Sequence, residues 1–376
     1  MVYSMMRYVP ILKTRDAELR GIENLAEDVK DAITPLWELT RSRRTKKDQD
    51  GKLQRRLEQV ARAFGVQREF GLDITSHIDL QNKEIIRLFQ QHDSYNAWVV
   101  FLEQQKISFP RLIPTLLMSD DGLEADQYIK VHKKEISKLH KSFDQYIYRV
   151  NFDYDDLEFD MNGVFGNSLL PIALLDMEYI PQGREKRYTE RAIEKIKVLA
   201  DAGIEKIILA GSSFPKSPTD GGGDTQGEHR CIEIDIYNNC KKKFPNLIYG
   251  DYATIYPLPN ERAGGQGWVP RIDFPVLYSK EDSISIRYHR DRKAKNEKSY
   301  SSAYIRVAKE VFKDEKFGKL RKQLGDNNWG IYQIWMASEG YPPALNPSFW
   351  ISVRINLYIA LQHSFLIEKS RRGYFK

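Results

Sequence analysis

Short apolar runs alternate with amphipathic stretches along the first two thirds of the chain. The clearest unit spans 205–257, where an apolar run at 207–210 precedes a helical stretch and a second apolar run, LIYGDYATIYP. Runs of this length, bounded by Gly and Pro, are typical of buried strands. A strand, a helix and a second strand predict a parallel pair. The glycine-rich insertion SPTDGGGDTQGEHR follows the first strand, at the end where α/β folds bind ligands.

The same alternation predicts eight strands, at 8–13, 34–40, 68–75, 109–118, 146–152, 171–180, 207–210 and 247–257. Helical spacing lies between them, as at Leu19, Ile22 and Leu25. Eight strands interleaved with helices in about 250 residues predict an α/β fold of the (β/α)8 TIM-like barrel type. A doubly wound open sheet is the alternative, but it usually has fewer strands, and no G-x-G-x-x-G follows the first strand.

The last third of the chain departs from this alternation. Residues 271–298 predict a β-hairpin that ends in a basic loop, and the tail that follows has helical spacing. We therefore expect a (β/α)8 barrel in 1–270 and, in 271–376, a β-hairpin and helical extension packed on the barrel. Trp329, Trp335 and Trp350 in this extension suit burial against a large surface.

Composition narrows the class of protein. The 376 residues are 41% hydrophobic and 29% charged, which is ordinary for a soluble globular protein. A net charge of +6 permits contact with nucleic acid without requiring it. Cys231 and Cys240 fall on roughly opposite sides of one predicted helix, so reduced thiols are expected. No run approaches the roughly 20 apolar residues of a membrane span and no signal-peptide pattern is present, so we expect a cytoplasmic protein without a membrane partner.

Polar residues gather at the carboxyl ends of the predicted strands, the end that faces the ligand in a barrel. They are Lys13, Glu38, Asp73, Arg149, Asn151, Asp176, Glu178, Ser212, Ser213, Asp251 and Tyr252. Because a buried charge is costly unless it is paired, acids beside a Lys and an Arg on one rim predict a site. The expected catalytic residues are Glu38, Asp73, Asp176, Asp251 and Tyr252. The expected ligand-binding residues are Lys13, Arg149, Ser212 and Ser213.

Three roles fit this set of side chains. Paired carboxylates can act as general acid and base on a glycosidic bond. Clustered acids, with Asp176 and Asp251 as the metal ligands, can hold Mg²⁺ or another divalent cation for phosphoester hydrolysis, while Lys13 and Arg149 neutralise phosphate. Alternatively, the charges neutralise one another in an ion-pair network that closes the barrel mouth. Zinc chemistry and a serine nucleophile have no supporting motif.

Two glycine-rich loops and two basic clusters add further signals. TDGGGDTQGEH and NERAGGQGW both follow strands on the predicted rim and suit either a lid or a surface loop. The clusters RSRRTKK and RDRKAKNEK carry enough charge to contact phosphate backbones. Neither cluster is interleaved with aromatic residues, which favours a solvated surface.

Several short motifs follow one another along the chain: YVPILK, PLWEL, SSFP, GDYATIYP, SIRYH and a late W-x-x-x-R-x-N formed by Trp350, Arg354 and Asn356. In this order they resemble the group of phage- and prophage-associated proteins called beta family protein, over about residues 7–363. The resemblance adds Arg287, Tyr288 and Arg354 to the expected ligand-binding residues. One departure lies in the tail, where Leu357 and Tyr358 stand where the group implies a histidine soon after Arg354.

The resemblance implies a role in phage defence or in a toxin–antitoxin-like pair, beside a protein partner from the same locus or a phage protein. Together with the rim residues it yields two hypotheses. In the first, the rim binds and hydrolyses a phosphate-containing ligand, a nucleotide or nucleic acid, as a metal-dependent hydrolase would. In the second, the barrel is a non-catalytic module that binds a toxin or phage protein through its C-terminal extension.

Overall fold

Eight parallel strands form the central sheet of the computed structural model, which describes residues 6–118, 122–166, 170–217, 225–259, 268–278, 280 and 282–371. The strands are β1 (Tyr8–Lys13), β2 (Leu36–Leu39), β3 (Phe70–Ile74), β4 (Leu112–Pro114), β5 (Ile147–Asn151), β6 (Ile172–Tyr179), β7 (Ile207–Ser212) and β9 (Ile248–Asp251). They pair in the order β4-β3-β2-β1-β9-β7-β6-β5. A bridge between Thr115 and Ile147 links the two outer strands, so the sheet is nearly closed as a barrel, as predicted.

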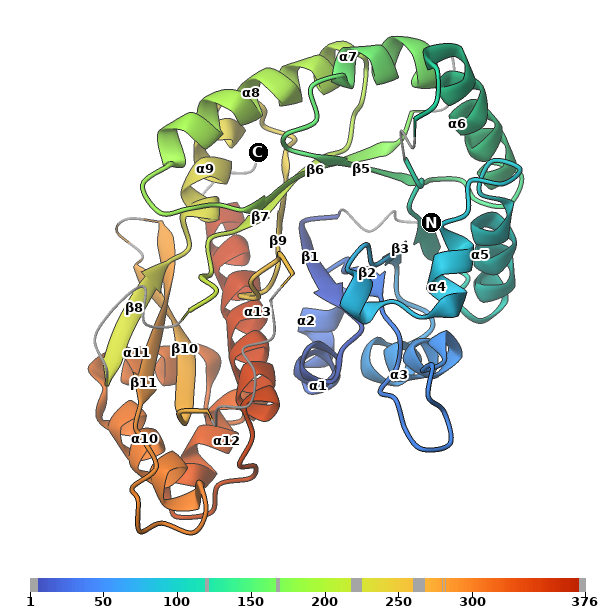
Figure 1. Ribbon diagram of the computed structural model, residues 1–376. Helices are drawn as coiled ribbons and strands as arrows, with labels where there is room; N and C mark the ends of the chain where they lie inside the picture. The colour runs from blue at the N-terminus through green and yellow to red at the C-terminus, as the bar shows by residue number, and fades with distance from the viewer. Residues whose placement is uncertain are drawn as a thin grey trace.

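Helices lie on the outer side of this barrel (Figure 1). They are α1 (Asp16–Glu23), α2 (Glu27–Asp31), α3 (Leu53–Phe64), α4 (Lys83–Leu88), α5 (Asn96–Ser108), α6 (Ala125–Leu139), α7 (Leu157–Phe159), α8 (Glu185–Asp201) and α9 (Ile232–Lys241), with a short 3-10 helix η1 (Ile78–Leu80) and a π-helix η2 (Asp160–Phe165). Their apolar residues and the outward side chains of the strands, such as Leu12 and Trp37, share one buried cluster. This layer between strands and helices is the larger part of the core.

The barrel interior is filled by the inward side chains of the strands. They form a separate buried cluster that includes Val9, Ile11, Leu36, Ile113, Ile147, Ile172, Leu174 and Ile208. Because side chains alternate between the two faces of a strand, the next inward position of β1 after Ile11 is Lys13. The register places Lys13 beside Glu38 of β2, and Glu38 beside Asp73 of β3. The apolar interior therefore ends in a charged layer at the carboxyl ends of the strands.

A second, antiparallel sheet stands beside the barrel (Figure 1). It consists of the predicted hairpin, β10 (Arg271–Tyr278) and β11 (Ser283–Arg290), and of β8 (Gln226–Arg230). The strand β8 is not predicted, since its residues QGEHR belong to the glycine-rich insertion expected to be a lid or a surface loop. It pairs with β11, with Glu228 opposite Arg287. Residues 218–224 and 260–267, which hold most of the two glycine-rich loops, lie outside the described residues.

Four helices complete the extension: α10 (Ser301–Lys313), α11 (Glu315–Leu324), α12 (Trp329–Ser338) and α13 (Pro347–Arg371). The long helix α13 packs against both α1 and β10. Gly21 permits this close approach, because a Cβ at that position would lie 2.9 Å from Cγ2 of Ile355. Trp350 is buried in α13 and stacks on Tyr304 of α10. Within the described ranges, no helix combines the length and the apolar character needed to cross a membrane.

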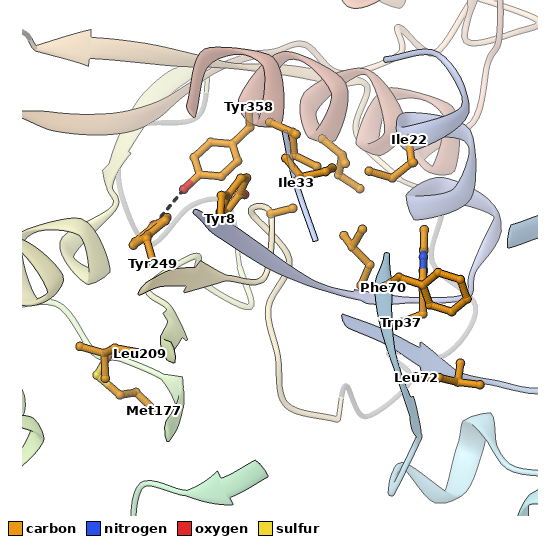
Figure 2. Packing of buried hydrophobic residues seen from close by; sticks show 14 of the residues in the cluster. Tyr8, Ile22, Ile33, Trp37, Phe70, Leu72, Met177, Leu209, Tyr249 and Tyr358 are labelled. Carbon is orange, nitrogen blue, oxygen red and sulfur yellow. Dashed lines mark hydrogen bonds between the residues drawn. The ribbon is translucent and has the colours of Figure 1, made fainter. Parts of the chain in front are cut away.

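Three tyrosines meet where α13 crosses the barrel wall (Figure 2). The rings of Tyr8 in β1 and Tyr249 in β9 stack with their centroids 5.6 Å apart. The hydroxyls of Tyr249 and Tyr358 of α13 lie 3.3 Å apart, within hydrogen-bond distance. The hydroxyl contact joins α13 to β9, and the stacked rings join β9 to β1.

Candidate functional site

A pocket of about 250 Å³ lies at the carboxyl ends of the barrel strands. We call it the mouth pocket. Its apolar side is formed by Phe89, Leu116, Leu117 and Met118, which follow β3 and β4. Its volume equals that of roughly eight water molecules in the liquid, which suits a small ligand. The polar side is lined by Lys13, Glu38, Asp73, Ser76, His77, Thr115, Arg149, Asn151, Asp176, Glu178 and Tyr252.

Arg149 of β5 lies at the centre of the charged groups in the mouth pocket. Its Nη1 donates to Oδ2 of Asp73 at 2.7 Å and to Oε2 of Glu38 at 3.3 Å. Its Nε and Nη2 donate to Oδ2 of Asp176 at 3.0 and 2.8 Å, and Nη2 also donates to the hydroxyl of Tyr252 at 3.0 Å. A guanidinium has five N–H groups, so these five bonds leave none for a ligand. Arg149 therefore organises the rim acids around itself.

Lys13 and Tyr252 extend this network to β1 and to the segment that follows β9. The Lys13 ammonium lies 3.6 Å from Oε1 of Glu38 and donates to the carbonyl of Pro257 at 3.3 Å. The hydroxyl of Tyr252 donates to Oδ2 of Asp176 at 2.6 Å. Among the described residues, the buried Oε1 of Glu38 accepts no hydrogen bond, so the Lys13 ammonium is its charged neighbour.

The carboxyl groups of the mouth pocket have opposite pKa shifts. Burial acts to raise the pKa of Glu38, but Lys13 and Arg149 outweigh it and lower that pKa to about 2. Burial raises the pKa of Asp73 in spite of its pairing with Arg149. Burial and the charge of Asp176 raise the pKa of Glu178. One pocket thus holds a carboxylate that stays ionised and carboxyl groups that take up a proton more readily.

Glu178 stands at a predicted strand end but is absent from the expected catalytic set, and the structure brings it into the mouth pocket. Its φ of 49° is unusual for a residue other than glycine, and it falls where the pairing register of β6 and β7 shifts. Its backbone N–H donates to Oδ1 of Asp176 at 2.9 Å. Backbone strain of this kind costs of order 1–3 kcal/mol and gathers at functional sites. The Asp-x-Glu spacing was the only sequence signal, since strain cannot be read from residue order.

Asp251 lies outside the mouth pocket, which corrects its expected place on the rim. Strand alternation turns it to the face opposite Tyr252. Its Oδ1 accepts from the hydroxyl of Tyr8 and the amide of Ala253, each at 2.8 Å, and its Oδ2 accepts from the hydroxyl of Tyr358 at 2.7 Å. Asp176 lines the mouth pocket and Asp251 does not. In the described part of the chain, no three His, Cys, Asp or Glu side chains are grouped to hold a metal ion.

The two rim serines take part in local hydrogen bonds beside β7 and do not line the mouth pocket. Ser212 donates to the carbonyl of Ile255 at 3.0 Å. The amide of Ser213 donates to Oε2 of Glu233 at 3.1 Å, and the hydroxyl of Ser213 donates to the same oxygen at 2.5 Å. Burial raises the pKa of Glu233 to about 8. The bonds of Ser213 fix the turn after β7 against the start of α9, and the bond of Ser212 ties β7 to the segment after β9.

The residues that the family resemblance adds lie in the extension. Arg287 of β11 pairs with Asp314, and the neighbouring Tyr288 is buried within the antiparallel sheet. Arg354 of α13 is also buried and pairs with Asp273 of β10 at 2.5 Å. None of these three predicted ligand-binding residues lines the mouth pocket. Arg287 and Tyr288 contact neighbouring elements of the extension, and Arg354 also donates to Thr254 in the segment after β9.

Comparison with known proteins gives a match along nearly the whole chain. A family model described as Beta protein matches residues 8–364. A relative named Protein beta, from Enterobacteria phage P4, is 25% identical over 359 residues, which cover 94% of this chain and 92% of the relative. The match includes the barrel strands, every residue of the mouth pocket and most of the extension.

Proposed function

This chain belongs to the Beta protein family, as the order of its motifs predicted, and from that premise we propose that its mouth pocket binds a small polar ligand and acts on it by general acid–base chemistry. The observation that carries the proposal is that one pocket holds two glutamates in different settings: Glu38 is ion-paired with Lys13 and Arg149, while Glu178 forms no ion pair among the described residues. The directions of their pKa shifts agree with this difference. Carboxyl groups whose environments push their pKa values apart are the pattern of an acid and a base.

The proposed roles follow from these environments. Glu38 stays ionised beside Lys13 and Arg149, so it is the proposed base. Glu178 forms no ion pair within the described residues and has a raised pKa, so it supplies the proton. Asp176 is held by Arg149 and Tyr252 and positions the strained turn that carries Glu178.

The charge of the mouth pocket favours a neutral or cationic ligand over a phosphate. Its lining carries two cationic side chains against four carboxyl groups, from Lys13, Arg149, Glu38, Asp73, Asp176 and Glu178. A phosphate would be repelled by the carboxylates and would have to displace one of them from Arg149. Hydroxyl or amino groups on a ligand would instead meet hydrogen-bond acceptors, while Phe89 and Met118 pack against its apolar part. Binding and hydrolysis of a phosphate-containing ligand is therefore the competing proposal.

A thermal-shift screen separates these two proposals. We expect nucleosides, sugars or amino sugars to raise the melting temperature, since binding at a hundredfold excess over Kd stabilises by about 2.7 kcal/mol. The shift should vanish in Glu38→Gln and persist in Glu190→Gln, a change of an exposed glutamate on α8. Nucleotides that shift the melting temperature more than their nucleosides would support the phosphate proposal. No shift with any compound would contradict both.

A turnover measurement then tests the acid–base step. With a ligand from the screen, Glu178→Gln should leave binding intact and slow product formation by about 10²–10⁴-fold, the usual contribution of one proton-transfer group. Wild-type turnover should fall as the pH rises through the raised pKa of Glu178, because the acid must be protonated. Equal turnover in both proteins would remove Glu178 from the mechanism.

We further propose that the protein acts in conflict between a phage and its host, beside a toxin or phage protein. What supports this role is its membership of a family that includes a phage protein. Expression of the wild type in a bacterial host should alter phage plating efficiency or relieve a co-expressed toxin from the same locus. The same expression of Glu178→Gln shows whether that effect depends on the mouth pocket.

A further inference from the structure

The positive charge of this protein resides in its C-terminal extension. Residues 271–376 contain 20 Lys and Arg against 11 Asp and Glu, although the net charge of the whole chain is only +6. The barrel part is therefore slightly acidic. A basic patch on one part of an otherwise acidic molecule is the electrostatic footprint of a polyanion-binding surface.

The loop between β11 and α10 concentrates part of this charge. Arg292, Lys295 and Lys298 are exposed there, and no residue in the described ranges forms an ion pair with them. The two acids of the same loop, Asp291 and Glu297, both pair with Arg306 of α10 and not with these three side chains. Three cationic side chains are left to meet an anionic partner.

An aromatic platform stands beside this loop, although the basic cluster contains no aromatic residue in sequence. Trp268 stacks on Tyr300, with ring centroids 4.4 Å apart and planes inclined by 22°. One face of the indole is thus supported, while the Trp268 side chain as a whole remains 40% exposed. The ammonium group of Lys293 lies 5.9 Å from the centroid of the Tyr300 ring, which joins the platform to the basic loop.

We propose that this surface, formed by Trp268, Tyr300, Arg292, Lys295 and Lys298, binds single-stranded nucleic acid. A base stacks on the exposed side of Trp268, and neighbouring phosphates pair with the three free cations. Stacking on aromatic side chains beside a basic track is how proteins hold single strands without reading their sequence. Duplex bases stay stacked inside the helix, so a duplex offers this platform only its phosphates. The surface is independent of the mouth pocket and of the chemistry proposed there.

Fluorescence anisotropy with labelled 20-nucleotide dT and rU strands tests the proposal on the full chain. We expect binding at 50 mM NaCl that weakens with salt, because phosphate contacts release counterions. Trp268→Ala should weaken it at least about fivefold, which is the lower end of the effect of removing one stacked base. Trp335→Ala is the matched control, since Trp335 is equally exposed at 40% but lies on α12. It should change the affinity by less than about twofold.

The charges are tested by Lys295→Gln combined with Lys298→Gln. This variant should bind more weakly and reduce the slope of log Kd against log salt by about 0.7 for each phosphate that it no longer neutralises. Lys186→Gln with Lys197→Gln on α8 is the control for removal of two surface charges. Melting temperatures of all variants establish that they are folded.

Three outcomes would overturn the proposal. One is that neither strand binds at 50 mM NaCl. Another is that Trp268→Ala and Trp335→Ala lower the affinity equally, which would make the effect unspecific. The third is that polyphosphate or an acidic peptide displaces the labelled strand as well as unlabelled dT does, while Trp268→Ala binds all of them with unchanged affinity. That result would identify a general anion-binding surface.

Discussion

Arg149 shows how one residue sets the character of a site. It holds three carboxyl groups that would repel one another without it, and it uses every N–H group to do so. A buried network of this kind adds little stability compared with apolar packing, but removal of its central charge leaves several buried charges uncompensated. The residue is therefore both the organiser of the mouth pocket and its most sensitive point.

Replacement of Arg149 by Met should destabilise the protein by about 3–5 kcal/mol at neutral pH. The destabilisation should shrink as the pH falls, because burial raises the pKa of Asp73, and a proton on Asp73 removes one of the uncompensated negative charges. Urea unfolding at pH 7.5 and pH 5 measures both effects.

The control for this change is Arg191→Met. Arg191 pairs with Asp153 at 2.9 Å and with Asp155 at 3.0 Å, and both acids are exposed. Surface pairs of this kind contribute no more than about 1 kcal/mol. Equal destabilisation in the two variants would show that the network of the mouth pocket contributes no more to stability than a surface ion pair does.

Glu233 gives a prediction for pH dependence. Its folded-state pKa is raised to about 8 by burial, whereas an unfolded glutamate titrates near 4.5. Between these values the folded protein holds a proton that the unfolded chain has released, so this group makes stability fall as the pH rises from about 5 to about 8. Glu233→Gln stays neutral throughout, and Ser213 can still donate to its amide oxygen. Melting curves should show that the melting temperature of the variant rises relative to that of the wild type as the pH rises. A difference in melting temperature that stays constant with pH would contradict the raised pKa of Glu233.

At the scale of elements, the strands of the barrel could be predicted because their apolar runs are short and regularly spaced. The direction in which each strand-end side chain points could not be predicted. Both faces of a barrel strand are buried, so its apolar pattern does not alternate. Lys13, Glu38, Asp73, Arg149, Asp176 and Tyr252 turn inward as expected for a rim site. Asp251 precedes Tyr252 by one residue and turns outward for that reason alone.

The strand β8 was missed for a different physical reason. Its residues QGEHR have no apolar periodicity and sit in a glycine-rich stretch, so local sequence favours a loop. Its partner β11 lies more than fifty residues further along the chain, and pairing over that distance leaves no local signal. Tertiary contact, with Tyr288 buried against it, decides the structure of this segment.

Gly227 in β8 should be intolerant of a side chain. A Cβ there would lie 2.5 Å from the hydroxyl oxygen and 2.7 Å from ring atoms of buried Tyr288. We expect Gly227→Ala to destabilise by about 1–3 kcal/mol through overpacking. Gly318 in α11 is the matched position, since a Cβ there meets nothing within 4 Å, and Ala should stabilise that helix by about 0.5–1 kcal/mol. Urea unfolding of both variants compares the signs, and a neutral Gly227→Ala would contradict the described packing.

At the scale of the whole molecule, barrel and extension are held together by buried polar groups as well as by apolar contact. Tyr358 of α13 bonds Asp251 of the barrel, and Arg354 donates to Oγ1 of Thr254 at 3.0 Å. A strand inserted after β7 completes the sheet of the extension. If either part were removed, apolar side chains at the contact between them would be exposed on the other part.

A fragment ending at residue 270 should therefore not fold as a soluble monomer. It would expose Tyr8, Tyr249 and the face of α1 that α13 covers, and it would leave Asp251 without its bond from Tyr358. Size-exclusion chromatography and far-UV circular dichroism of the fragment, beside the full chain, test this expectation. A monomeric fragment with a cooperative melting curve would show that the barrel is an independent unit.

Because α13 follows the barrel strands along the chain, the element order also sets an order of events during synthesis. The last barrel strand ends at Asp251, and α13 ends at Arg371. At 5–20 residues per second, a ribosome needs roughly 6–24 s to add the intervening stretch. During that interval Tyr8 and Tyr249 lie uncovered on the nascent barrel, and β8 lacks its partner until β11 has been made. A chaperone that recognises such surfaces would have its target only until α13 has docked.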